Sequence, residues 1–368
     1  MQKLIKWFFK AALFFTGILP LLKCSSGYKE KNGKVSFNGK EITDKSFVVF
    51  NDVFAKDSAN AYYKEKSISG ADVASFTAVD EYYAKDKNNV YYCDEYREGQ
   101  NYYLTKKQTI STVENALPAS FVSIGNGYAK DSVHGFRAYI AFNVKDIATL
   151  KSINNAFVKD DVQAYFNLKP VGGSDGKSFE VIDHSYAKDT AHIYYYAQPG
   201  EVKSGIYVLP CNHSAFKVLD YPYSKDDVSV FYENTKMNGV HAASFNVLQN
   251  GFSKDKNAVY FETQKIAAAD TASFMVFKEN ELYTENFYYA KDNTSVFWKN
   301  IKLNDADLVN FKVLGMGYGS DGKHVFYKTN IIKNADPDSF KVYPHDFGDA
   351  DAEDAANKYH EGVKVQPE

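Results

Sequence analysis

Residues 83–92 have the sequence Tyr-Ala-Lys-Asp-Lys-Asn-Asn-Val-Tyr-Tyr, and variants of this stretch recur along the chain. Two short apolar runs flank a polar centre, which predicts two β-strands joined by a tight turn. Asp86 opens the turn, where its carboxylate can accept a hydrogen bond from the backbone N–H two residues on. The residues that follow the aspartate are not consistently Gly or Asn in the other copies. This favours a four-residue loop built on a type I turn over a two-residue turn with positive φ.

The turn aspartate recurs at a regular interval. Its nine copies are Asp57, Asp86, Asp131, Asp160, Asp189, Asp226, Asp255, Asp292 and Asp321. Five of the eight intervals are 29 residues long, and the other three exceed 29 by 8 or 16. A fixed period of this length indicates a repeat architecture, in which each unit buries its apolar face against its neighbours.

The rest of the repeat follows from residue patterns around this turn. A phenylalanine ten residues before most of the aspartates begins a Phe-x-Val alternation, as at 245–247, which predicts a strand with one buried face. A short turn such as 270–274 suits one capped helical turn. The extra residues at 93–109, 196–205 and 278–287 are predicted to be surface loops, because insertions in a regular array fall where nothing is packed.

These patterns predict an all-β fold. About nine 29-residue β-hairpin repeats over residues 47–345 would form a solenoid-like or extended array of stacked hairpins. A β-propeller is the alternative, and it is disfavoured because 29 residues are few for a four-stranded blade. Residues 27–46 suggest a small hairpin that caps the array, and the Ala-, Asp- and Glu-rich residues 346–368 suggest an acidic flexible tail.

The stretch at 83–92 resembles the signature of the DKNYY repeat family, which comprises exported bacterial repeat proteins without an established activity. The resemblance covers roughly residues 47–342. It departs from the family pattern at 131–137, where the second strand lacks the aromatic pair. The resemblance implies a class of repeat protein and no particular chemistry.

The N-terminus predicts export. Residues 1–26 combine a basic start with an apolar run at 11–22, as in a signal peptide, a lipoprotein signal or an uncleaved anchor. Residues 21–24, Leu-Leu-Lys-Cys, resemble a bacterial lipobox except for the lysine, so Cys24 is a candidate for lipidation. The expected location is the cell envelope, with membrane contact only through the N-terminal anchor or a lipid.

Charge and cysteine content limit the partners. The net charge is -3, from 43 basic and 46 acidic residues. Without residues 1–26, which hold four lysines and no acidic residue, the balance is 39 against 46, or -7. Such a body argues against a nucleic-acid partner. Cys93 and Cys211 could form one disulfide, but two separate thiols are favoured because the residues lie four repeats apart.

No residue pattern predicts catalysis, a cofactor or a metal. The histidines form no recognised metal motif, and His134, His192 and His324 are interpreted as solvated turn residues. The G-x-S-x-G match at 172–176 falls in a connection between repeats, where a nucleophile elbow is not expected. The repeated aspartates could bind calcium, but a turn-forming role with a surface ion pair to the preceding lysine is favoured.

The periodic aromatic side chains are the best candidates for function. Stacked rings can bind sugars or the apolar groups of a partner, and they can equally hold the repeats together. The candidate partner-facing aromatics are Tyr63, Tyr92, Tyr195, Tyr232, Phe261, Trp298 and Tyr327. The sequence therefore predicts a non-catalytic cell-envelope repeat protein that acts as a structural scaffold or binds an unidentified protein or glycan. A hydrolase acting on envelope polymers and aromatic-mediated carbohydrate binding are the alternatives.

Overall fold

The computed structural model describes residues 27–97, 99, 106–201, 204–278, 288–343 and 350–366. The regular secondary structure of the described residues is almost entirely β-strand, and the chain divides into two compact units, residues 1–181 and 182–368. The predicted N-terminal signal and Cys24 lie outside the described residues. No helix in the described ranges combines the length and the apolar character that a membrane span requires.

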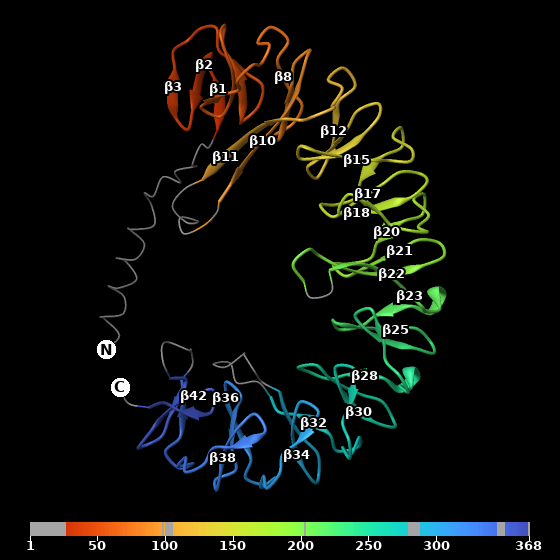
Figure 1. The fold of residues 1–368 in the computed structure, drawn as a ribbon, viewed down its shortest axis with the longest axis vertical. Coiled ribbons are helices and arrows are strands. Elements are labelled where there is room, and N and C mark those ends of the chain that lie inside the picture. Colours follow the sequence, from red (N-terminus) through yellow and green to blue (C-terminus); the bar gives the residue numbers. More distant parts are fainter. Residues whose placement is uncertain are drawn as a thin grey trace, which may run out of the picture. The chain divides into compact units, whose positions relative to one another are not determined.

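Unit 1 begins with a three-stranded sheet in the region predicted to form a cap, and four-stranded antiparallel sheets follow it (Figure 1). Its strands are β1 (Tyr28–Lys31), β2 (Lys34–Phe37), β3 (Lys40–Ile42), β4 (Val48–Val49), β5 (Phe54–Lys56), β6 (Ala61–Tyr63), β7 (Lys66–Ser67), β8 (Thr77–Ala78), β9 (Tyr83–Lys85), β10 (Val90–Tyr96), β11 (Lys107–Thr112), β12 (Val122–Gly125), β13 (Tyr128–Lys130), β14 (Gly135–Arg137), β15 (Ile140–Phe142), β16 (Lys151–Ser152), β17 (Phe157–Lys159), β18 (Ala164–Phe166), β19 (Lys169–Pro170) and β20 (Glu180–Val181).

Unit 2 continues the same pattern and adds two single 3₁₀ turns, η2 (His213–Ala215) and η3 (Ala242–Ser244). Its strands are β21 (Tyr186–Lys188), β22 (Ile193–Ala197), β23 (Gly205–Leu209), β24 (Lys217–Val218), β25 (Tyr223–Lys225), β26 (Val230–Tyr232), β27 (Thr235–Lys236), β28 (Asn246–Val247), β29 (Phe252–Lys254), β30 (Val259–Phe261), β31 (Gln264–Lys265), β32 (Met275–Val276), β33 (Tyr289–Lys291), β34 (Val296–Trp298), β35 (Ile301–Lys302), β36 (Lys312–Gly315), β37 (Tyr318–Ser320), β38 (Val325–Tyr327), β39 (Asn330–Ile331), β40 (Lys341–Val342), β41 (Ala352–Glu353), β42 (Lys358–His360) and β43 (Val363–Lys364).

Each repeat is an antiparallel sheet whose four strands pair in sequence order, as in β4-β5-β6-β7. The Lys-Asp turn joins the two central strands, and in the second repeat Lys85 pairs with Val90 across a four-residue loop, as predicted. The array of β-hairpin repeats is thereby confirmed. The argument that 29 residues are too few for four strands is wrong, because strands of two or three residues let β4–β7 fit within residues 48–67.

The core lies between consecutive repeats. In unit 1, Tyr83 of the second repeat packs 5.2 Å from the ring of Phe121, which opens the third repeat. Both side chains are buried in one cluster with Val90 and Phe136. Because this cluster draws on two repeats, neither repeat could bury its own apolar face alone. Phe136 also shows that the third copy forms its hairpin with one buried aromatic, although Arg137 takes the place of the second.

Two predicted surface loops are partly regular structure. In the insertion after the second repeat, β10 pairs with β11 from Tyr91 opposite Thr112 to Tyr96 opposite Lys107. The insertion at 196–205 similarly lengthens β22, which pairs with β23. These residues extend a hairpin because the central strand already presents a backbone edge on which they can pair. Most of the third insertion, 278–287, lies outside the described residues.

The predicted flexible acidic tail is wrong for residues 350–366. β41, β42 and β43 pair with β40 and complete a tenth repeat. Asp354 opens its turn by accepting hydrogen bonds from the N–H groups of Ala356 (2.8 Å) and Asn357 (2.7 Å). Tyr359 is buried beside Phe340. One buried aromatic and one turn aspartate are enough to order a segment whose composition indicated disorder.

Candidate functional site

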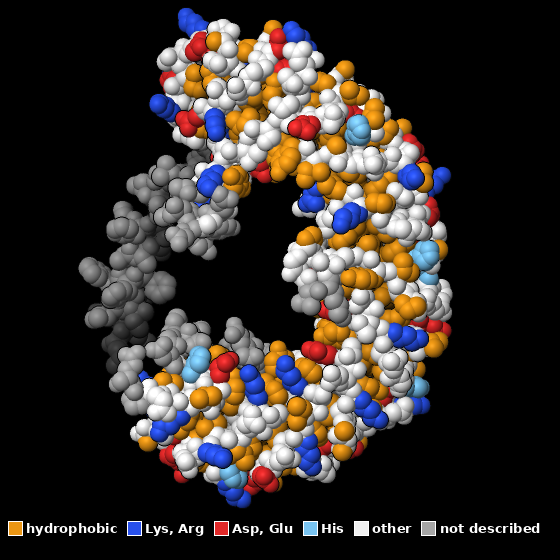
Figure 2. Space-filling view, viewed as in Figure 1, with side chains coloured by type: hydrophobic (Ala, Val, Ile, Leu, Met, Phe, Trp, Pro, Cys, Tyr) orange, Lys and Arg blue, Asp and Glu red, His pale blue; other side chains and the backbone are white. Residues whose placement is uncertain are grey.

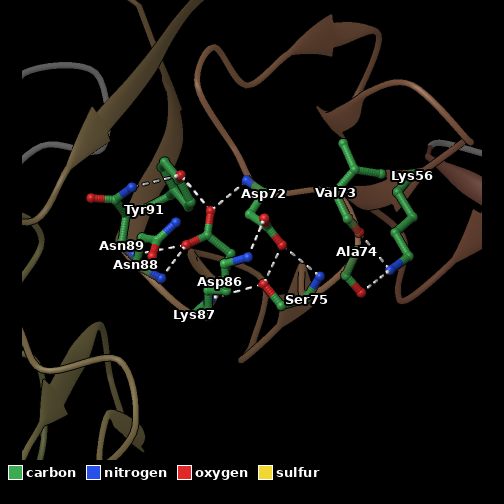
Figure 3. Close-up of polar contacts among 10 residues, drawn as sticks. All are labelled: Lys56, Asp72, Val73, Ala74, Ser75, Asp86, Lys87, Asn88, Asn89 and Tyr91. Atoms are coloured by element: carbon green, nitrogen blue, oxygen red, sulfur yellow. Dashed lines mark hydrogen bonds and ion pairs between the residues drawn. The ribbon is translucent and has the colours of Figure 1, made fainter.

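Asp86, the turn aspartate of the second repeat, is a buried acceptor of four hydrogen bonds (Figure 3). Asp86 Oδ1 accepts from the N–H groups of Asn88 (2.7 Å) and Asn89 (2.8 Å). Its Oδ2 accepts from the Tyr91 hydroxyl and from the N–H of Asp72, both at 2.7 Å. The carboxylate therefore joins the hairpin turn, the second hairpin strand and the short turn that begins the repeat.

The same network recurs in both units. The second oxygen accepts from the N–H fourteen residues earlier in the pairs Asp131–Leu117, Asp160–Asp146, Asp226–Asn212, Asp255–His241 and Asp321–Asp307. The hydroxyl five residues later donates to it in the pairs Asp57–Tyr62, Asp160–Tyr165, Asp189–Tyr194, Asp255–Tyr260 and Asp354–Tyr359. The aspartate is thus a structural residue of the repeat, as predicted for a turn former.

The electrostatics agree with this structural role. Burial opposes ionisation of Asp86, but the hydrogen bonds from Asp72, Tyr91, Asn88 and Asn89 outweigh it and hold the pKa below its ordinary value. Burial, followed by the bond to the carboxylate, raises the pKa of Tyr91 to about 12. An ionised carboxylate that already accepts four hydrogen bonds has little capacity left to bind a cation or to transfer a proton. Within the described residues, no group of three His, Cys, Asp or Glu side chains could hold a metal ion.

A serine or threonine that sequence reasoning missed completes the network. Ser75 Oγ donates to Asp72 Oδ1 (2.7 Å) and accepts from the N–H of Lys87 (3.0 Å; Figure 3). Thr149 and Ser273 occupy the same position and accept from Asp161 and Asn293. The signal was present as Asp-x-x-Ser/Thr directly before the phenylalanine or its substitute, at 72–75, 146–149, 270–273 and 336–339.

The lysine before the aspartate serves the next repeat. Lys56 Nζ donates to the carbonyl oxygens of Val73 (2.8 Å) and Ala74 (3.3 Å), the turn that opens the second repeat (Figure 3). The equivalent bonds in the other repeats are Lys85–Pro118, Lys130–Ile147, Lys159–Phe179, Lys225–Ala242 and Lys254–Thr271. The predicted surface ion pair between this lysine and its aspartate is therefore wrong. The lysine donates to carbonyl oxygens that end the turn of the next repeat, because the aspartate carboxylate already accepts hydrogen bonds from other donors.

The structure also corrects the candidate partner-facing aromatics. The four that are buried within the array are Tyr63, Tyr195, Phe261 and Trp298. The three that are partly exposed are Tyr92, Tyr232 and Tyr327. Trp298, for example, packs 4.7 Å from Tyr289 and so serves the core.

The remaining candidates also have structural roles. Ser174 of the G-x-S-x-G match is buried, donates to the Val171 carbonyl (2.8 Å) and accepts from the Ala164 N–H (2.9 Å). His324 Nδ1 lies 3.3 Å from Asp321 Oδ2 of its own turn. Cys93 is buried and Cys211 is partly buried, and both are free cysteines. Burial raises the pKa of the Cys211 thiol to about 11.

One groove in unit 1 is lined by aromatic side chains that remain partly exposed. It encloses about 550 Å³ between the second and third repeats, and its lining includes Tyr82, Tyr92, Asp94 and Arg137. The rings of Tyr82 and Tyr92 are nearly parallel, with an angle of 15° and a centroid distance of 6.4 Å. The ring of Tyr139 lies beside the groove, 6.1 Å from that of Tyr92 at an angle of 63°, and 52% of the surface of Tyr139 is exposed.

Fold and network together define a repeat protein, in which short antiparallel sheets are joined by backbone-directed side chains. The family model described as the DKNYY family matches residues 13–95, 54–198 and 223–361, so the chain belongs to the DKNYY family. No curated protein matches the chain, and no solved structure does.

Proposed function

We propose that the chain is a non-catalytic scaffold of the cell envelope that binds a partner along its repeat array. One observation carries this proposal. Most side chains of the repeated motif are buried or occupied in holding the repeats together, whereas Tyr82 and Tyr92 stay partly exposed in a groove, with Tyr139 beside Tyr92. Aromatic side chains that remain partly exposed in a concave site are typical of binding surfaces.

A hydrolase would need two carboxyl groups free to act on one bond. In the groove, Asp94 accepts hydrogen bonds from the Tyr92 hydroxyl (3.0 Å) and the Glu95 N–H (2.7 Å). Asp80 Oδ1 accepts from the N–H groups of Tyr82 and Tyr83, both at 2.7 Å. These commitments favour a binding role over catalysis.

The cell-envelope location rests on the basic and apolar residues 1–26 and on Cys24 as a lipidation candidate. The surface supports a partner other than nucleic acid. Acidic and basic side chains are interspersed over the visible face of the described residues (Figure 2). A nucleic-acid partner would require a basic stripe.

Co-sedimentation with envelope material tests the proposal. The purified chain would be incubated with polysaccharide and membrane fractions of the producing cell, and the bound fraction would be measured against the amount added. Saturable binding that heat-unfolded chain does not reproduce is the expected result. Absence of saturable binding to every fraction would refute the scaffold function.

A further inference from the structure

Tyr82 and Tyr139 depart from the repeat pattern. Tyr82 stands four residues before its turn aspartate, where the third, seventh and ninth repeats have glycine, the fourth has Ala156 and only the eighth also has a tyrosine, Tyr288. Tyr139 stands eight residues after its aspartate, where the sixth to ninth repeats have Asn or Thr. Repeats with small or polar residues at these positions form the same sheets, so the sheet of a repeat does not depend on a tyrosine at either position. The rings of both tyrosines contact that of Tyr92, which lines the groove together with Tyr82.

The polar groups of the groove are mixed donors and acceptors. Asn126 Nδ2 donates to Ser152 Oγ at 2.9 Å. Arg137 lies over the ring of Tyr128, 5.3 Å from its centroid, and donates to Asn167 Oδ1 at 3.3 Å. With the Glu81 carboxylate as acceptor and the Arg137 guanidinium as donor, the lining can both accept from and donate to the hydroxyls of a sugar, while its rings suit the apolar faces of sugar rings.

Charge narrows the ligand class. Asp80, Glu81 and Asp94 face a single guanidinium, that of Arg137, so the groove disfavours an anionic ligand. A basic peptide is also disfavoured, because Asp80 and Asp94 already accept hydrogen bonds from the protein. A neutral ligand rich in hydroxyl groups fits both conditions.

The groove has room for more than one sugar unit. A second groove of about 640 Å³, lined among others by Phe50 and Val53 of the first repeat, shares Asp80 and Glu81 with the first groove. Both volumes fall in the range of ordinary ligand sites, and the shared residues make the two grooves adjoin. We infer that this continuous groove of unit 1 binds a neutral oligosaccharide through Tyr82, Tyr92 and Tyr139. The inference rests on the proposed binding function and names its ligand class.

Binding would be measured with the full chain on an array of neutral oligosaccharides that includes cellohexaose, maltohexaose and N-acetyl-chitohexaose, followed by calorimetry on those retained. Tyr139→Ala and Tyr82→Gly remove the rings, and the second places there the residue that other repeats carry. Tyr207→Ala, at a 37% exposed tyrosine of unit 2, is the matched control. Each ring variant is expected to weaken binding about tenfold, and the control is expected to leave it unchanged.

Three results would overturn the inference. The inference is wrong if no neutral oligosaccharide binds, or if the control variant weakens binding as much as Tyr139→Ala does. It is also wrong if hexalysine binds and the ring variants abolish that binding, because the groove would then be assigned to a basic peptide. Circular dichroism identifies a variant that fails to fold. In that case the binding measured for Tyr139→Ala decides the question, because this side chain is exposed. If saturable binding to envelope fractions persists in all these cases, the sugar site is refuted and the scaffold function is not.

Discussion

Lys56 Nζ lies 2.8 Å from the carbonyl oxygen of Val73, in the following repeat, although Asp57 is its neighbour in the sequence. The two motif residues therefore act in different repeats. The aspartate accepts hydrogen bonds within its own repeat, whereas the lysine donates to the turn that opens the next repeat. The tyrosine three residues before the aspartate also reaches forward in several repeats, as when Tyr289 donates to the carbonyls of Gly317 (3.0 Å) and Lys328 (2.9 Å). These side-chain hydrogen bonds therefore run in one direction, from a repeat to the repeat that follows it in the sequence.

The tenth repeat lacks both forward-reaching groups. Asp351 and Glu353 replace the tyrosine and the lysine, at the same distances from the turn aspartate Asp354. Asp351 instead accepts from the hydroxyl of Tyr318 (2.6 Å), in the repeat before it. Glu353 accepts from the hydroxyl of Tyr343 (2.6 Å). The tenth repeat therefore carries neither of the two donors that other repeats extend to the carbonyls of the repeat after them.

Removing the turn carboxylate should destabilise the array. Asp86→Ala leaves the N–H groups of Asp72, Asn88 and Asn89 and the Tyr91 hydroxyl without their acceptor. Unmet buried donors predict a loss of about 3 kcal/mol in the free energy of unfolding. Urea unfolding followed by circular dichroism measures it.

Lys87→Ala is the matched control for Asp86→Ala. Lys87 is 63% exposed and pairs with Asp72 at 2.8 Å, so its loss should cost less than about 0.5 kcal/mol. Equal losses in the two variants would contradict the role assigned to Asp86.

Restoring the missing lysine of the ninth repeat should stabilise the chain. Ser320 occupies that position, and a cavity of about 540 Å³ lined by Ser320 and Pro337 lies beside it. In Ser320→Lys, the ammonium group would reach the carbonyls of the turn at 336–340, as Lys56 does at 72–76. We expect a gain of about 1 kcal/mol, measured by urea unfolding. Ser320→Met fills the same space without the charge, and an equal gain there would show that packing alone is responsible.

Removing one forward-reaching hydroxyl should weaken the array without unfolding it. In Tyr289→Phe the carbonyls of Gly317 and Lys328 lose a buried donor. A loss of about 1 to 2 kcal/mol is expected. The fold should persist, because Phe54, Phe157 and Phe252 stand naturally at this position. Hydrogen exchange should increase around residues 317–328, and unchanged exchange there would argue against the contact between repeats.

The sequence revealed those features that depend on local pattern. Asp86 and its turn were predictable because their contacts lie within one repeat, and the recurrence of the pattern strengthened the signal. The role of Lys56 was not, because its partners are backbone carbonyls, which carry no residue identity. The tail was predicted to be flexible from its composition, although the tyrosine five residues after Asp354 was a visible signal of another repeat.

The candidate site was only partly predictable. Tyr92 was identified from its place in the aromatic pair, but Tyr63 and Trp298 share that place and are buried. Exposure of the second aromatic differs between repeats that share the motif. It depends on side chains of the adjacent repeat, so the motif alone does not predict it. Tyr82 and Tyr139 were not predicted, because neither belongs to the residue pattern that recurs from repeat to repeat. The signal that could have found them is an aromatic where other repeats have small or polar residues.

Acid should unfold the array through its turn aspartates. Hydrogen bonds overcome burial and hold the pKa below its ordinary value in Asp86 and Asp160, and in Asp354 they lower it to about 2. Since the folded pKa is depressed, the stabilisation is complete above the unfolded value of about 4 and is lost as the pH falls through the folded values toward about 2. Thermal unfolding measured across this window should therefore show a steep decline in melting temperature. Asp160→Asn should lower the melting temperature at neutral pH and flatten the decline, whereas Asp161→Asn, at the exposed neighbour, should change neither. A melting temperature that stays level down to about pH 2 would contradict the ionised, hydrogen-bonded state of these carboxylates.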